Sequence, residues 1–129
     1  MNIMPAAEIS HIEFWVANLR KSLEFYDAFF SILGWSRLSE NSFSNGTTKI
    51  YFCQMDIASK DTLGPRHICF RVLSSEVVDD VGAFLRKTNT RVIRGPLAMN
   101  EYSKDYYTVD FCDPDNYILE VAYSPHSKR

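Results

Sequence analysis

The sequence predicts an α+β fold made of two copies of one βαβββ module. Three observations support it. The six residues from His11, HIEFWV, return from His67 as HICFRV, with His, Ile, Phe and Val matched. Each copy continues with a helix-like pattern and then short strand-like runs. A polar stretch that ends in Gly64-Pro65 separates the copies. A chain of 129 residues suits one domain whose two halves share a core.

The first module spans about residues 8–58 and opens with a strand at 9–16. Asn18 is a favourable N-cap for the helix that follows, and Gly34 ends that helix. Two further strands are predicted at 35–39 and 49–55, with an irregular edge strand at 40–44. Asn45-Gly46 is the strongest short hairpin signal in the chain.

The second module spans about residues 65–123, after a linker at about 59–65, and repeats the same order. A strand at 66–72 leads to a Ser74/Ser75 cap and a helix with acidic residues early and basic residues late, as the helix dipole favours. The next strands are predicted at 91–94, 106–112 and 117–123. The turn Asp113-Pro114-Asp115-Asn116 joins the last two. Residues 124–129 form a loose tail.

Composition excludes several classes of partner. The chain is 46% hydrophobic and 23% charged, with a formal net charge of −2 and no stripe of Lys and Arg. Nucleic acid and membrane surfaces are therefore not expected partners.

The sequence also bears on location and redox state. No apolar run reaches the roughly 18 residues of a membrane span, and the first ten residues lack a secretory pattern, so we expect a cytoplasmic protein. Its three cysteines are widely spaced and without a CxxC, which argues against disulfides and thiolate zinc sites.

The repeated strand indicates a metal site. Successive strand residues point to opposite faces, so Ile, Phe and Val of the repeat share one face while His11 and His67 lie on the other. On the last strand Glu120 is the one ionisable residue, and a buried carboxylate needs a partner. Two imidazoles and a carboxylate form the facial arrangement that leaves coordination positions open on iron, manganese or zinc. Alternatively, His11 and His67 are ordinary strand histidines, and Glu120 is an edge carboxylate that faces water.

Strand phase also predicts what lines the cavity around that site. A mixture of polar groups with one aromatic wall suits a small-molecule substrate. Glu13 and Asp110 are the candidates for proton transfer. The alternative is packing with an internal ion-pair network, in which Asp110 pairs with Arg71. A loop at 96–105 would cover the cavity mouth. The residues predicted to bind substrate are Trp15, Cys69, Arg71, Thr108 and, from that loop, Tyr102.

Two stretches resemble the vicinal oxygen chelate superfamily: HIEFWVANLRKSLEFY from His11 to Tyr26, and FCDPDNYILEV from Phe111 to Val121. That superfamily includes glyoxalase I, fosfomycin-resistance proteins, extradiol dioxygenases and bleomycin-resistance proteins. The resemblance implies a curved, eight-stranded half-barrel around a divalent metal, with ligands that fall here on His11, His67 and Glu120. Glyoxalase I has a fourth ligand, often Glu, late in the first module, where this chain has only residues 51–54, YFCQ.

The three-ligand pattern is nearer to the fosfomycin-resistance type, although Asp110 stands where those proteins commonly have a Tyr. The resulting hypothesis is a small enzyme that depends on Mn, Zn, Fe or Ni and acts as a lyase, isomerase or thiol transferase. Its main rival is a non-catalytic binding protein of the bleomycin-resistance kind. A regulatory module with a vestigial site is a third possibility. Members of this superfamily pair modules within one chain or between two, and a homodimer is expected here.

Overall fold

The computed structural model describes residues 6, 8–56 and 67–127. It confirms the predicted fold class, because both halves have the order βαβββ. The predicted linker at about 59–65 and the end of the tail lie outside the described residues. The elements are β1 (His11–Val16), α1 (Leu19–Ile32), β2 (Ser36–Ser39), β3 (Ser42–Ser44), β4 (Lys49–Gln54), β5 (Ile68–Val72), α2 (Ser75–Lys87), β6 (Val92–Ala98), β7 (Tyr107–Cys112) and β8 (Ile118–Tyr123).

The strands form two four-stranded sheets with the same topology, in the orders β1-β4-β3-β2 and β5-β8-β7-β6. In each sheet the first strand of the module pairs in parallel with the last, while the remaining pairs are antiparallel. The two repeat strands, β1 and β5, are both edge strands of their sheets. Each of these two strands therefore pairs with a neighbour of its own sheet along one side only.

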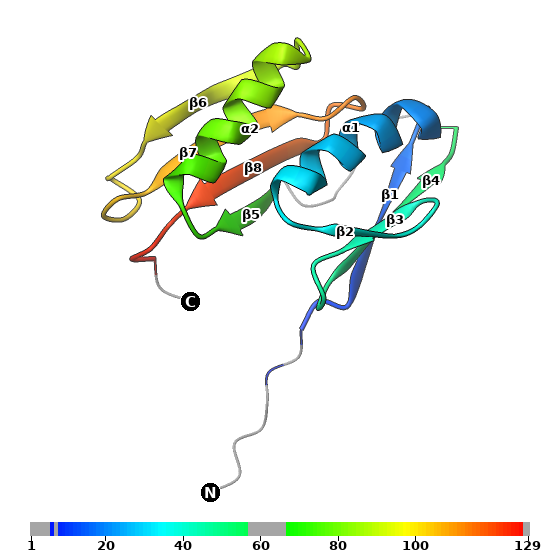
Figure 1. Ribbon diagram of the computed structural model, residues 1–129, viewed down its shortest axis with the longest axis horizontal. Coiled ribbons are helices and arrows are strands. Elements are labelled where there is room, and N and C mark those ends of the chain that lie inside the picture. The colour runs from blue at the N-terminus through cyan, green and yellow to red at the C-terminus, as the bar shows by residue number, and fades with distance from the viewer. Residues whose placement is uncertain (1–5, 7, 57–66, 128–129) are drawn as a thin grey trace, which may run out of the picture.

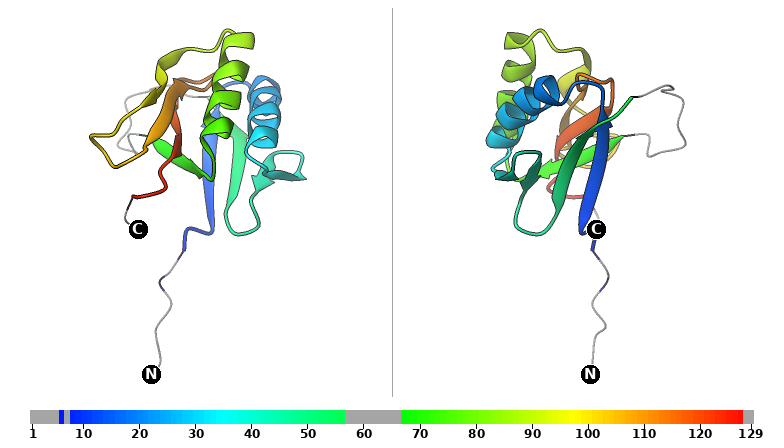
Figure 2. Two further views of the ribbon diagram at one scale, coloured as in Figure 1. Left: turned by 60° about the vertical axis from the view of Figure 1, so that its left-hand side comes forward. Right: turned by 90° about the vertical axis from the view of Figure 1, so that its right-hand side faces the viewer.

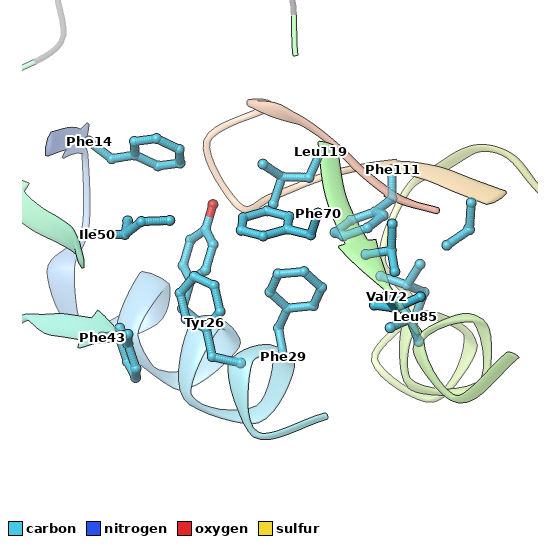
Figure 3. Close-up of a cluster of buried hydrophobic side chains, with 14 of the residues drawn as sticks. Phe14, Tyr26, Phe29, Phe43, Ile50, Phe70, Val72, Leu85, Phe111 and Leu119 are labelled. Carbon is cyan, nitrogen blue, oxygen red and sulfur yellow. The ribbon is translucent and has the colours of Figure 1, made fainter. Parts of the chain in front are cut away.

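The two helices lie side by side on one side of the sheets and cover them (Figure 1; Figure 2). Phe29 of α1 joins the two halves, because its ring packs against Phe70 of β5 and Phe111 of β7, with centroids 5.6 and 5.4 Å away. Trp35 also contacts Phe70. Figure 3 shows this aromatic cluster between the two halves. The modules thus share one core. Among the described helices, neither is long and apolar enough to cross a membrane.

The turn between β7 and β8 ties the second half to the first. The buried Asp113 accepts a hydrogen bond of 2.6 Å from the hydroxyl of Tyr26 on α1 and two more from the backbone N–H groups of Asp115 and Tyr117. Asp115 accepts from the backbone N–H of Ala17, just before α1. Burial raises the pKa of Asp113 to about 6, against the opposing effect of its hydrogen bonds.

Several predicted boundaries change for local reasons. The strand predicted at 91–94 continues to Ala98, so the start of the predicted loop at 96–105 belongs to β6. The ladder between β6 and β7 is irregular on both sides of Arg94. Gly95 there has φ +90°, and a Cβ on it would lie 2.4 Å from the carbonyl oxygen of Thr108. Only glycine fits this close approach of the two strands.

Candidate functional site

Glu120 is the centre of a polar cluster on the face of the second sheet opposite the helices. It sits on β8, directly across from Cys69 of β5 and Asp110 of β7, and its exposed fraction is 6%. Its Oε2 accepts hydrogen bonds of 2.7 Å from the hydroxyls of both Tyr106 and Thr108. Its Oε1 lies 3.2 Å from Nε2 of His67. The predicted carboxylate therefore meets one of the two predicted histidines.

Cys69 lies against the same carboxylate. Desolvation of the thiol, followed by the charge of Glu120, raises the pKa of Cys69 to about 12. The thiol therefore stays protonated at neutral pH, and because the thiolate is the nucleophilic form, Cys69 is unsuited to nucleophilic attack. Cys69 lines the site as a neutral side chain.

Asp110 pairs with Arg94, so its predicted partnership with Arg71 is wrong. Arg94 faces Asp110 across the β6–β7 ladder, and its Nε donates to Asp110 Oδ2. Arg71 lies on β5, which β8 separates from β7. Arg94 also donates from Nη1 to the hydroxyl of Tyr102, at 3.1 Å. The other oxygen of Asp110, Oδ1, is buried and has no hydrogen-bond partner in the described parts of the chain.

The predicted residues of the first module lie on β1, in the other sheet. His11 is exposed, 3.2 Å from the hydroxyl of Ser10 and edge-on to the ring of Tyr51. Glu13 accepts a hydrogen bond of 2.9 Å from the indole of Trp15, whose exposed fraction is 51%. These three residues share one exposed strand face. Arg71, on β5, is exposed as well.

Within residues 8–56 and 67–127, no three His, Cys, Asp or Glu side chains are grouped closely enough to hold one metal ion. One chain thus brings together two of the three predicted ligands, His67 and Glu120. The third, His11, does not join them in that chain.

Sequence reasoning missed two residues of this cluster. Tyr106 and Tyr107 are neighbours in the sequence, but only Tyr107 turns to the helix side, where its hydroxyl donates to Asp79. Tyr106 precedes β7 and lies on the same face as Thr108 and Asp110, so the alternation of strand residues could have placed it in the cluster. The position of Arg94 could not have been predicted in this way, since it depends on the irregular pairing around Gly95.

A cavity of about 310 Å³ opens between the two halves, beside β5. Its walls are mainly apolar and come from both modules, with Arg71 and Cys69 among the polar residues. A volume of this size is at the lower end of small-molecule sites. Its lining comprises Ile9, Ile12, Leu33, Trp35, Asn45, Thr48, Ile50, Ile68, Cys69, Phe70, Arg71 and Val72.

Comparisons with known proteins agree with this architecture. The family model described as Glyoxalase/Bleomycin resistance protein/Dioxygenase superfamily matches residues 8–121. Among solved structures, a glyoxalase/dioxygenase from Nostoc punctiforme is similar, with a TM-score of 0.74, 18% identity and coverage of 98% of this chain and 99% of that one. No curated protein matches the chain.

Two further solved structures resemble the chain over most of their length. A glyoxalase/bleomycin resistance protein from Albidiferax ferrireducens has a TM-score of 0.72 and 20% identity, and the match covers 91% of this chain and 98% of that one. A lactoylglutathione lyase from Agrobacterium tumefaciens has a TM-score of 0.64 and 18% identity, with 94% and 96% covered. At these identities the likeness concerns the fold.

Proposed function

This chain belongs to the Glyoxalase/Bleomycin resistance protein/Dioxygenase superfamily, and from that premise we propose that it is a small metal-dependent enzyme. The proposed reaction is a lyase, isomerase or thiol-transfer step on a small molecule whose oxygens bind at open positions on a divalent ion, Mn, Zn, Fe or Ni. One observation carries the proposal: the buried carboxylate of Glu120 directs Oε1 at Nε2 of His67, 3.2 Å away.

That distance suits two ligands of one ion. Nitrogen and oxygen ligands lie about 2.1 Å from zinc, so two of them are about 3.0 Å apart at a right angle and about 3.4 Å apart at a tetrahedral angle. The charge balance supports the same proposal. The other donors to Glu120 are neutral hydroxyls, and a buried carboxylate is stabilised by a cation. His67 and Glu120 would therefore hold the ion.

We assign the third ligand to His11 of a second copy of the chain, in a homodimer. Within one chain His11 lies on the exposed face of β1, in the other sheet from Glu120. Both repeat strands are sheet edges, so the two sheets of different copies can approach each other at β1 and β5. The exposed ring of Trp15 on β1 would then be covered and would face the substrate.

When bound, the ion would supply Lewis-acid chemistry by polarising a carbonyl, phosphonyl or epoxide oxygen. Asp110 is the residue we assign to proton transfer. Arg94 fixes its Oδ2, and the buried Oδ1 has no hydrogen-bond partner among the described residues, so that oxygen would accept a proton from a substrate group that reaches it from the metal side. Glu13, the other candidate, is engaged by the indole of Trp15.

Metal analysis of protein purified without added ions tests the proposal. The parent should carry stoichiometric divalent metal, and His67→Ala and Glu120→Gln should each lose most of it, because each removes a ligand. His126→Ala is the matched control, since this histidine pairs with Asp105 and is not one of the proposed ligands. Metal-free parent protein, or full retention in His67→Ala, would contradict the assignment.

A non-catalytic binding protein of the bleomycin-resistance kind is the second candidate, and the apolar cavity between the halves favours it. Under that function, an aromatic ligand would bind in the cavity without metal. Titration of the metal-stripped protein with a set of aromatic compounds distinguishes the two. Tight binding together with an absence of bound metal in the parent would support the second candidate over the first.

A further inference from the structure

We propose that Tyr106 and Thr108 are positioning residues that restrict Glu120 to one-oxygen binding of the metal, through Oε1. The proposal rests on the proposed function and adds to it how many coordination positions the protein itself occupies. A carboxylate that binds through both oxygens takes two positions on the ion. One restricted to a single oxygen leaves the second position to a substrate oxygen or to water.

The two carboxylate oxygens of Glu120 have different hydrogen-bond partners. An ionised carboxylate oxygen has about two lone-pair directions. Both hydroxyls reach Oε2, each at 2.7 Å, whereas Oε1 faces His67. The acceptor capacity of Oε2 is therefore used, and Oε1 is left for the ion.

The two donors are held by the fold. Thr108 is fully buried on β7, the strand next to β8, and Tyr106 comes two residues earlier on the same face. The ring of Tyr106 packs edge-on against Tyr102, with centroids 5.3 Å apart. Thr108 also lies 3.1 Å from the carbonyl oxygen of Val121, and of the two acceptors the carboxylate is both closer and charged, which favours it for the one hydroxyl hydrogen. Glu120 thus has little freedom to rotate.

A purely structural role would give a different result. If the hydroxyls only satisfied a buried carboxylate, their removal would lower the free energy of unfolding but leave the affinity of the folded protein for metal unchanged. Hydrogen bonds that orient a ligand instead change that affinity, typically 10- to 100-fold for each bond. Metal affinity separates the two roles.

The test compares Zn²⁺ affinity of the full-length parent with that of Tyr106→Phe and Thr108→Val, by competition with a chelator, and follows the visible spectrum of the Co²⁺-loaded proteins. Both variants should bind Zn²⁺ about 10- to 100-fold more weakly. Their Co²⁺ spectra should shift as Glu120 gains a second bond to the ion. Thr108→Ser, which keeps the hydroxyl, should restore the parent's affinity.

Tyr107→Phe is the matched control, because it removes a neighbouring hydroxyl that donates to Asp79 on the helix side of the sheet. Its Zn²⁺ affinity should equal the parent's. Unchanged affinity and spectra in Tyr106→Phe and Thr108→Val would overturn the positioning role and leave the proposed function standing. An equal loss in Tyr107→Phe would also overturn it. A parent that binds neither ion would overturn the proposed function itself.

Discussion

Three carboxylates of this protein are stabilised in three different ways at the residue scale. Glu120 receives two hydroxyls and faces an imidazole. Asp110 has an arginine on one oxygen and an unpartnered second oxygen within the described residues. Asp113 is bound by a tyrosine hydroxyl and two backbone N–H groups, and no cationic side chain of the described residues pairs with it. These surroundings decide which carboxylate is open to chemistry and which is structural.

The raised pKa of Asp113 predicts a pH dependence of stability. The native state, with a pKa of about 6, holds the proton that the unfolded chain releases near its ordinary pKa of 3.8. The native state therefore binds more protons between about pH 4 and pH 6. The stabilisation linked to this proton is complete below pH 4 and is lost as the pH rises through 6, by up to about 3 kcal/mol.

Chemical denaturation of the parent and of Asp113→Asn across pH 4–7 measures this effect. The other titratable groups around Asp113, which are Tyr26, Asp115 and Tyr117, are the same in both proteins. The free energy of unfolding of the parent should fall relative to the variant as the pH rises through this window. Parallel pH profiles would show that Asp113 does not titrate there.

At the scale of elements, the two helices begin differently although the sequence gives each a capping residue. The side chain of Asn18 accepts a hydrogen bond of 3.0 Å from the backbone N–H of Lys21 and caps α1. Ser74 holds the N-cap position of α2, but its side chain makes no capping hydrogen bond. Glu76 in the first turn and Arg86 and Lys87 in the last still complement the dipole of α2.

This difference gives a paired prediction. Asn18→Ala should lower the free energy of unfolding by about 1 kcal/mol, because an unsatisfied N–H is left at the start of α1. Ser74→Ala should change it by less than about 0.5 kcal/mol, since no hydrogen bond is lost. Urea denaturation of both variants measures the difference. Equal losses would show that Ser74 caps α2 in solution.

At the scale of the whole molecule, the two modules share a core but present their predicted site residues separately. Phe29, Phe70 and Phe111 join the halves beneath the helices. On the opposite side, Glu120 and His67, which directly precedes β5, lie at one sheet and His11 at the other. A complete three-ligand site therefore depends, in our proposal, on how two copies associate.

Complementation tests that arrangement. Neither His11→Ala nor Glu120→Gln should hold the ion as a homodimer. A heterodimer of the two, isolated through two different affinity tags, should bind one ion per dimer, because one of its sites then combines an intact His11 with an intact His67 and Glu120. A heterodimer that carries no metal, beside a parent dimer that carries two, would exclude a shared site.

Local sequence patterns were sufficient to predict the fold class and two members of the candidate site, His67 and Glu120. The HIxFxV motif, the Asn18 cap and the Asp113 turn each extend over only a few residues of the sequence. Hydrophobic alternation assigned His67 and Glu120 to the faces opposite the apolar residues of their strands. The partner of Asp110 could not be found in this way, because Arg94 reaches it through an irregular ladder around Gly95.

Periodicity and turn chemistry along the chain are enough to predict the two βαβββ units, their order and which residues of each strand share a face. Three contacts could be found only in the folded molecule. Tyr106 donates to Glu120 while Tyr107 donates to Asp79 of α2, and Asp113 accepts from Tyr26 of α1. His11 and His67 belong to different halves and do not meet within one chain. The physical reason is that such contacts depend on how separate strands and helices pack, and packing joins residues that no local pattern relates.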